Sequence, residues 1–413
     1  MIRTVVTPFA PEPERVRAVR EGLPALAASI YLNTGSVGPL PAETAAAMED
    51  LARWERDLGR GSPDSIPDVM QRLAEARAAA ASLLATDVAN IALTRSATDG
   101  INTFLAAIDL RPGDHVVTTS QEHPAVTGPL DLAKRRGVEV AVADIGDGGD
   151  DARTVAAIEA ALTARTRLVV LSHVLFTTGA VLPLAAIGAM CRARGILFLV
   201  DGAQAAGAIP VDFDASAADG YAIAGQKWLL GPEGTGALAL RAEFTERSTP
   251  GLGGYFNFSS MGPDGPTLWP DARRFEYAFI HRSSVLGFAR SIAWLQMFVG
   301  LDWVHARGAR LARAAADRLA TIPGVHVLTP VDRMATLVTF TIDGWSAGAA
   351  YEELGARVFA MTRTIDPLGA LRISVGFFNS EEELERFMGA VELIAAHTPE
   401  TLPPRQTLTI IEA

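Results

Sequence analysis

Short apolar runs alternate with helical stretches along the middle of this 413-residue chain, and that alternation constrains its fold more than any other feature. Residues branched at Cβ, which favour strands, are frequent in the runs. The segments between the runs have the spacing of amphipathic helices. Such alternation predicts a mostly parallel sheet covered by helices on both faces. The predicted strands are IALT (91–94), HVVTT (115–119), VEVAVA (138–143), RLVVLS (167–172), ILFLVD (196–201) and YAIAG (221–225).

The pattern changes after about residue 240. A Gly-rich loop covers 251–266, and a long helical stretch follows near 283–322. Further strands and helices are typical of a smaller α+β domain, and the strands are predicted at 325–328, 335–342 and 370–376. Because the chain is too long for one ordinary core, we expect a division into domains. The expected parts are an N-terminal segment (1–30) that packs on the small domain, a large domain (31–290) and a small C-terminal domain (291–413).

Composition narrows the classes of partner. The formal net charge is −11 with no basic block, which argues against nucleic acid as a partner. The single cysteine, Cys191, excludes a disulfide framework and a cysteine-based metal cluster, and we predict no metal site. The first residues lack the apolar core of a signal peptide, and no apolar run is long enough to cross a bilayer. We therefore expect a cytoplasmic protein with no membrane partner.

Chemically active residues follow the predicted strands, where parallel sheets bind their ligands. Hydroxyl residues between Thr94 and Gly100 precede a helix, and a helix start can bind a phosphate. His123 follows the second strand, Asp201 ends the fifth, and Lys227 comes shortly after the sixth. A phosphate turn, a flat imidazole, a carboxylate and an amine together fit pyridoxal phosphate, which needs a lysine Schiff base and a protonated ring nitrogen.

Each of these residues also has an ordinary structural explanation. Serine and threonine are common N-caps, a histidine before a proline can cap a loop, and a lysine after a strand is usually solvated. The order and spacing of all four favour the cofactor site.

The run LVDGAQA (199–205), followed by GQKWLLGPEG (225–234), resembles the class V aminotransferase family of fold-type I pyridoxal-phosphate enzymes. The resemblance extends from YLNTG (31–35) through RISVGFFN (372–379). The family includes cysteine desulfurases, isopenicillin N epimerase-like proteins, kynureninases and cysteine/cystine C–S lyases. The resemblance implies an α/β fold with a mostly parallel large domain and a smaller α+β domain. It also implies a homodimer with the site near the subunit interface.

The resemblance also implies roles for individual residues. Lys227 is expected to form the Schiff base and to move protons, and Arg372 is expected to hold the substrate carboxylate. Asn33 is expected on the substrate side as well. The remaining cofactor contacts implied are Asp201 at the pyridine nitrogen, Gln204 near the ring oxygen, His123 on the ring face, and Ala97, Thr98 and Gln226 at the phosphate.

Five positions depart from the family pattern. Gln226 stands where the family usually has histidine, Ala224 where serine is frequent, and Phe176 where desulfurases have asparagine. The Gly-Thr pair that contacts the partner subunit's phosphate in many members corresponds to Ala278 and Phe279, with His281, Arg282 and Ser283 as nearby substitutes. We therefore expect the cofactor to be held differently from the usual member.

The stretch from Tyr351 to Leu371 contains no cysteine, so a persulfide-forming desulfurase is not expected. The local sequence at Glu122–Val126, Ser172–Leu175 and Lys227–Gly234 resembles that of cysteine/cystine C–S lyases and of the cysteine S-conjugate enzymes of lincosamide biosynthesis. We predict β-elimination from an L-cysteine S-conjugate, or from cysteine or cystine, which gives a thiol, pyruvate and ammonia. Three alternatives stay open: oxidative decarboxylation–deamination to an aldehyde in antibiotic biosynthesis, a class V aminotransferase or epimerase, and a non-catalytic relative.

Aromatic residues offer a further hypothesis about the pocket wall. Substrate-lining residues are sought among Tyr255, Phe256, Phe258, Phe377 and Phe378, for which core packing or a subunit contact is an equal alternative. The loop 251–266 is expected to cover the site or to reach across a dimer interface.

Overall fold

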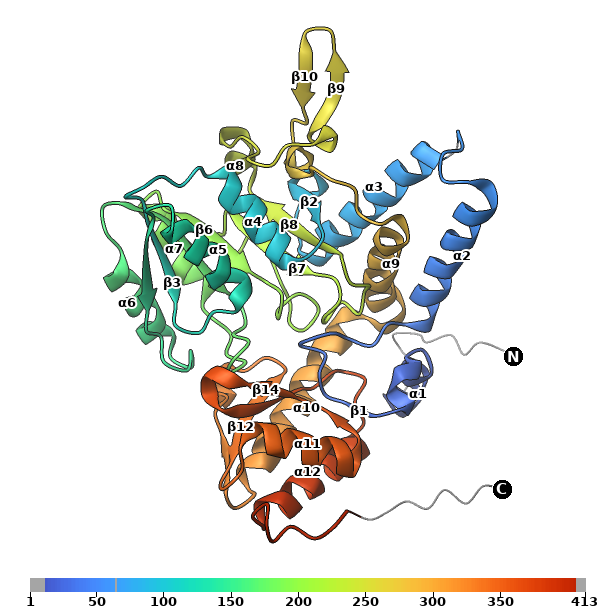
Figure 1. Cartoon of the computed structure of the whole chain (residues 1–413), viewed down its shortest axis with the longest axis vertical. Coiled ribbons are helices and arrows are strands. Elements are labelled where there is room, and N and C mark those ends of the chain that lie inside the picture. Colours follow the sequence, from blue (N-terminus) through green and yellow to red (C-terminus); the bar gives the residue numbers. More distant parts are fainter. Residues whose placement is uncertain (1–11, 64, 406–413) are drawn as a thin grey trace.

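The computed structural model describes residues 12–63 and 65–405. A large body built around the central sheet lies above a smaller one, which contains the C-terminal helices and strands (Figure 1).

The large sheet has seven strands in the order β2-β8-β7-β6-β5-β3-β4. All run parallel except β8, which is antiparallel to both of its neighbours. This confirms the predicted mostly parallel sheet, and all six predicted runs are strands. The strand β8 was missed, because its sequence GALAL carries no β-branched residue. The strands are β2 (Ile91–Thr94), β3 (His115–Thr119), β4 (Glu139–Ala143), β5 (Thr166–Ser172), β6 (Leu197–Asp201), β7 (Gly220–Ala224) and β8 (Gly236–Leu240).

The central strands of this sheet are buried on both faces, which explains why β6, β7 and β8 are apolar along almost their whole length rather than alternating, whereas the edge strand β4 is partly exposed. In β5, Leu168 and Val170 pack into a core shared with α4 (Ala97–Ala107) and α5 (Pro124–Lys134). Val169 and Leu171, which point the other way, pack into a core shared with α6 (Asp151–Ala161) and α7 (Leu184–Ala193). The same face is extended by α2 (Ala42–Leu58) and α3 (Ser65–Leu83), which pack on α9 (Arg282–Ala293).

The small body contains a four-stranded antiparallel sheet in the order β11-β12-β15-β14. Its helices are α10 (Leu301–Ala320), α11 (Ala347–Val358) and α12 (Glu381–Ala395). Beside it, β1 (Ile30–Tyr31) pairs in parallel with β13 (Ala360–Met361). The three predicted strands are present, whereas the short β13 and β14 were missed. The sheet consists of β11 (Val325–Val327), β12 (Leu337–Ile342), β14 (Arg363–Ile365) and β15 (Ala370–Ser374).

The predicted long helix near 283–322 is broken. It consists of α9, a π-helical segment over Trp294–Val299, and α10. The chain bends by 84° between the part that ends at Val299 and α10. Gly300 lies at the bend with φ +87°, a conformation that a side chain disfavours. This bent pair satisfies the length and composition of a membrane span only when its two parts are taken together, and no single helix in 12–63 or 65–405 does so.

The N-terminal helix α1 (Glu12–Glu21) is tied to the helices of the small body. Arg20 pairs with Glu383 of α12 at 2.6 Å, and Glu12 pairs with Arg307 of α10. Residues 1–11 and 406–413, which fall in the predicted N-terminal segment and small domain, lie outside the described residues. The boundaries predicted at residues 30 and 290 stay a prediction.

The Gly-rich stretch 251–266 is not only a loop. It contains most of a hairpin formed by β9 (Phe258–Gly262) and β10 (Gly265–Leu268), which projects from the large body at the top of Figure 1. Short α8 (Ala242–Arg247) precedes it. No residue of the stretch 251–266 lines the cavity described below.

A buried ion pair fixes α3 to the sheet. Arg77 donates two hydrogen bonds to Glu276 at 2.8 and 2.7 Å, and Glu276 also accepts from the Leu93 N–H of β2. We expect Arg77→Ala to lower the free energy of unfolding by about 3–5 kcal/mol, since it leaves a buried carboxylate without its partner. Chemical denaturation measures this loss.

The exposed pair of Arg165 and Glu139, with side chains 54% and 52% exposed, is the matched control. Arg165→Ala should change the free energy of unfolding far less than Arg77→Ala does, because water screens an exposed ion pair. Equal effects of the two substitutions would contradict the role given to Arg77.

Candidate active site

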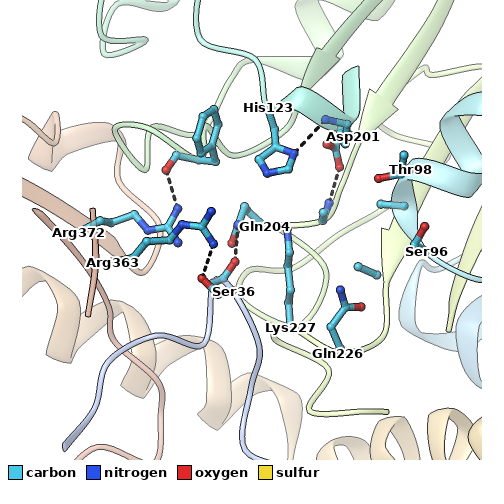
Figure 2. A pocket seen from close by; sticks show the side chains of 16 residues that line it. Ser36, Ser96, Thr98, His123, Asp201, Gln204, Gln226, Lys227, Arg363 and Arg372 are labelled. Atoms are coloured by element: carbon cyan, nitrogen blue, oxygen red, sulfur yellow. Dashed lines mark hydrogen bonds between the residues drawn. The ribbon is translucent and has the colours of Figure 1, made fainter. Parts of the chain in front are cut away.

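A cavity of about 220 Å³ lies at the carboxyl ends of the large sheet, against the small body. It brings together eight of the nine residues predicted for the site: Ala97, Thr98, His123, Asp201, Gln204, Gln226, Lys227 and Arg372 (Figure 2). The ninth, Asn33, does not line it. Sequence reasoning missed Gly35, Ser36 and Arg363, which do.

Lys227 and Asp201 reach the cavity from two neighbouring parallel strands. Asp201 is the last residue of β6, and Lys227 follows β7 by three residues. Burial lowers the pKa of Lys227 to about 8; Asp201 acts against this shift, whereas Arg372 and Arg363 add to it. Burial raises the pKa of Asp201, against Lys227 and the Ala203 N–H, which donates to Oδ1 at 2.9 Å. The pair thus combines a reactive amine with a carboxylate whose Oδ2 accepts no hydrogen bond from the described residues.

His123 is held as a neutral imidazole. It is the N-cap of α5, where its Nδ1 accepts a hydrogen bond from the Ala125 N–H at 3.1 Å. Burial, and next the charges of Lys227, Arg363 and Arg372, lower its pKa to about 4. The proton therefore lies on Nε2 near neutral pH. The ring meets the edge of Phe176 at a centroid distance of 5.0 Å.

The end of the cavity at the start of α4 suits a phosphate. Helix α4 begins there at Ala97, with Ser96 as its N-cap and Thr98 in its first turn. The free N–H groups of a helix start attract anions. Gln226 lies across from them, and its buried Oε1 has no hydrogen-bond partner among the described residues. A side-chain amide is readily turned to present its N–H₂ instead, so these residues fit the phosphate of the predicted cofactor.

Gln204 joins the cavity floor to the N-terminal strap, the loop of residues 33–38. Its Nε2 donates to the Gly35 carbonyl at 2.8 Å, and its Oε1 accepts from the Trp228 indole at 2.9 Å. A Cβ at position 35 would lie 2.8 Å from Ser374 Oγ and 3.0 Å from Arg372 Nη2. Glycine is therefore required for the strap to pass this close.

Two arginines lie on the remaining side. Arg363 and Arg372 are directly opposite one another on the antiparallel strands β14 and β15. Arg372 is 1% exposed, and its Nη1 donates to the Phe176 carbonyl at 2.7 Å. Arg363 is exposed and donates to Ser36 Oγ at 2.8 Å. Ser36 in turn donates to Asn33 Oδ1 at 2.7 Å, so Asn33 supports the arginine from behind.

Neither arginine forms an ion pair with any carboxylate in the described part of the chain. Burial, and next the charge of Arg363, lower the pKa of Arg372 to about 9, so it remains a cation near neutral pH. Like charges directly opposite on paired strands repel. The pair is therefore a ready site for an anion.

The residues suggested as substitutes for the Gly-Thr pair, and the aromatic residues suggested as pocket lining, lie outside the wall of this cavity. Arg282 is occupied by Glu55 at 3.1 Å and by Ser65, whereas the neighbouring Ser283 Oγ is buried and, within the described ranges, has no partner. Tyr255, Phe256 and Phe279 form an aromatic cluster away from the cavity. Phe377 and Phe378 belong to the hydrophobic core. Phe176 is instead the aromatic residue of the cavity wall.

A model of the aminotransferase class-V family matches residues 30–387. The chain belongs to the class V aminotransferase family. It is therefore a fold-type I enzyme that uses pyridoxal phosphate, as the resemblance predicted.

Curated relatives match most of the chain. A probable cysteine desulfurase of Methanothermobacter thermautotrophicus is 27% identical over 398 residues, covering 92% of this chain and 98% of the relative. An isopenicillin N epimerase of Streptomyces clavuligerus is 30% identical over 384 residues, covering 88% of this chain and 94% of the relative.

Among solved structures, the cystine C–S lyase C-DES in complex with its reaction product cysteine persulfide has a TM-score of 0.85 and 29% identity. The match covers 91% of this chain and 100% of the lyase chain. A second C-DES structure carries glycine linked covalently to the pyridoxal phosphate cofactor.

The lowered pKa of Lys227 generates a prediction about cofactor attachment. The neutral amine is the form that attacks an aldehyde, and with a pKa of about 8 its fraction rises about tenfold from pH 7 to pH 9. We expect the rate of covalent attachment of added pyridoxal phosphate to rise by that factor and then level off. Absorbance in the visible band of the Schiff base measures it.

Lys227→Ala should give no such band, and borohydride reduction followed by peptide mapping should label only Lys227. A rate that rises roughly hundredfold over this range would indicate an ordinary lysine with a pKa near 10.5 and would contradict the assignment.

Proposed function

We propose that this enzyme cleaves the Cβ–S bond of an S-substituted L-cysteine by β-elimination. The observation that carries the proposal is the cross-strand pair of Arg363 and Arg372, two cations without a carboxylate partner in the residues described, beside Lys227. Arg372, buried and fixed by the Phe176 carbonyl, is positioned to take the α-carboxylate. Arg363, at the exposed side, is positioned for a second anionic group on the sulfur substituent. Cystine has such a group.

The proposed cofactor contacts follow from the fit described above. The start of α4 at Ala97 and Thr98, together with Gln226, would hold the phosphate. Asp201 would accept a hydrogen bond from the pyridine nitrogen, His123 would lie on the ring face, and Gln204 would adjoin the ring oxygen. Bound pyridoxal phosphate supplies an electron sink that stabilises negative charge at the substrate Cα.

The protein groups perform the proton transfers and the orientation. Lys227, as a neutral amine, removes the Cα proton, and the electron pair left at Cα forms a Cα–Cβ double bond as the Cβ–S bond breaks. The sulfur leaves as a thiolate. Water then completes the overall change from an S-substituted cysteine to a thiol, pyruvate and ammonia. The arginine pair holds the substrate so that the Cα–H bond faces Lys227.

A desulfurase that stores sulfur on its own cysteine is disfavoured by the position of the single cysteine. Cys191 lies on α7 in the core, 1% exposed. Burial raises the pKa of its thiol to about 12, so the nucleophilic thiolate is absent near neutral pH. The sulfur therefore has to leave with its substituent.

The proposal includes a second copy of this chain as partner. Tyr255 and Phe279 are 57% and 61% exposed, and Met261 at the end of the projecting hairpin is 70% exposed. A two-stranded hairpin is marginally stable without further contacts, so these apolar side chains favour burial in a homodimer.

The arginines generate the test. We expect Arg372→Met to lower kcat/KM by about 100-fold for every S-substituted cysteine, which corresponds to the loss of charge-assisted hydrogen bonds. Arg363→Met should lower kcat/KM about tenfold for cystine but leave S-methylcysteine, which has no second carboxylate, within about twofold. Pyruvate and thiol are measured as products.

Arg313→Met, which removes an exposed arginine of α10 paired with Asp317, is the matched control and should leave both substrates unchanged. Oxygen uptake with carbon dioxide and an aldehyde as products would replace β-elimination by the oxidative route. Amino transfer to an oxoacid would overturn the proposal in favour of an aminotransferase.

A further inference from the structure

A buried carboxyl group lies behind the cavity wall and has no part in the proposed reaction. Glu122 is 8% exposed, in the turn between β3 and α5. Its Oε1 accepts from Thr119 Oγ1 and its Oε2 from Ser172 Oγ, both at 2.6 Å. Within residues 12–63 and 65–405, no cation forms an ion pair with it. A carboxyl group buried without a cation beside it in the described residues is unfavourable when ionised, so its presence needs a reason.

Glu122 is connected to two residues of the candidate active site. His123, whose ring lines the cavity, is its immediate neighbour in the chain. Ser172, which donates to Glu122, is the last residue of β5 and lies directly opposite Asp201 in the parallel register with β6. A change in the position or charge of Glu122 is therefore transmitted to the ring face through His123 and to the ring nitrogen side through Asp201.

The groups around Glu122 determine its charge. Thr119 on β3 and Ser172 on β5 donate hydroxyls, and Asp201 on β6 is the charged group that faces it. Burial raises the pKa of Glu122 to about 7; the hydrogen bonds from Ser172 and Thr119 act against the rise, whereas Asp201 adds to it. Glu122 thus changes from neutral to anionic near pH 7.

We propose that Glu122 is a positioning residue that anchors His123 and, when ionised, places a second negative charge behind Asp201. That charge favours a proton on the pyridine nitrogen and on the Lys227 linkage, since both are cations in the same buried region. A carboxylate pair in one buried site also couples the two titrations. The inference rests on cofactor binding and not on the substrate proposed above.

The test is a pH titration of the absorbance of the reconstituted enzyme between about pH 5.5 and 9. Glu122→Gln keeps the shape and can still exchange hydrogen bonds with both hydroxyls, but it cannot ionise. We expect the wild-type enzyme to show a spectral step near pH 7 that Glu122→Gln lacks. The midpoint of the Lys227 linkage should fall by about half a pH unit or more in this variant, because a neighbouring negative charge is lost.

Ser172→Ala separates the charge from mere packing. It retains the carboxyl group but removes a hydrogen bond that stabilises the carboxylate, so the step should persist and move to higher pH. A role confined to holding β3 against β5 would leave the step unchanged in Glu122→Gln. A Glu122→Gln titration that matches wild type therefore overturns the proposal, whatever the substrate tests show.

Unfolding gives a second readout, also usable if Glu122→Gln retains no cofactor. A folded-state pKa raised from 4.5 to about 7 means that the contribution of Glu122 to stability is greatest at low pH and is lost as the pH rises from about 4.5 to about 7. We expect the denaturation midpoint of wild type to fall more between pH 5 and pH 8 than that of Glu122→Gln. Equal falls in the two proteins would contradict a buried, titrating Glu122.

Discussion

The coupling of Lys227 with Asp201 is the interaction on which the site depends. Burial alone would neutralise both groups, yet each favours the charged form of the other. They come from adjacent parallel strands, β6 and β7, so the register of the sheet sets their separation. A fold with the same residues on unconnected loops would have to fix both side chains against water. Here the two-sided core of the sheet does so.

The site is nevertheless not a property of the large domain alone. The arginines come from the antiparallel pair β14 and β15, and the strap at Gly35 and Ser36 passes between the two bodies. A bridge between Asn33 and Ser374 and the hydrogen bond from Gln204 to Gly35 connect these parts. Cofactor-side and substrate-side residues are thus held by different sheets, and the strap fixes one against the other.

The sequence predicted the parts of the site that follow long apolar strands. His123, Asp201 and Lys227 each come after such a run, and parallel strands bring their carboxyl ends to one edge. Arg363 was missed because β14 has three residues, too few for a visible period. The break at Gly300 was missed because the flanking sequence is helical on both sides, and one glycine is tolerated in many helices. Asn33 was predicted to contact the substrate. In the structure its Oδ1 accepts a hydrogen bond from Ser36, which itself lines the cavity. Residue spacing in the sequence does not encode such an indirect relation.

Two features of this region are unfavourable for the stability of the folded protein, and both concern electric charge. Arg363 and Arg372 are like charges directly opposite one another, and Glu122 is a carboxyl group without a cation. At Arg77 and Glu276, by contrast, the buried charges are paired and hydrogen-bonded. Unpaired charge destabilises the empty site and is compensated when an ion of opposite sign binds. An anionic substrate of the proposed kind would relieve the arginines, and protons on the cofactor would relieve an ionised Glu122. The same imbalance that weakens the empty protein therefore contributes to the affinity and the charge state of the loaded one.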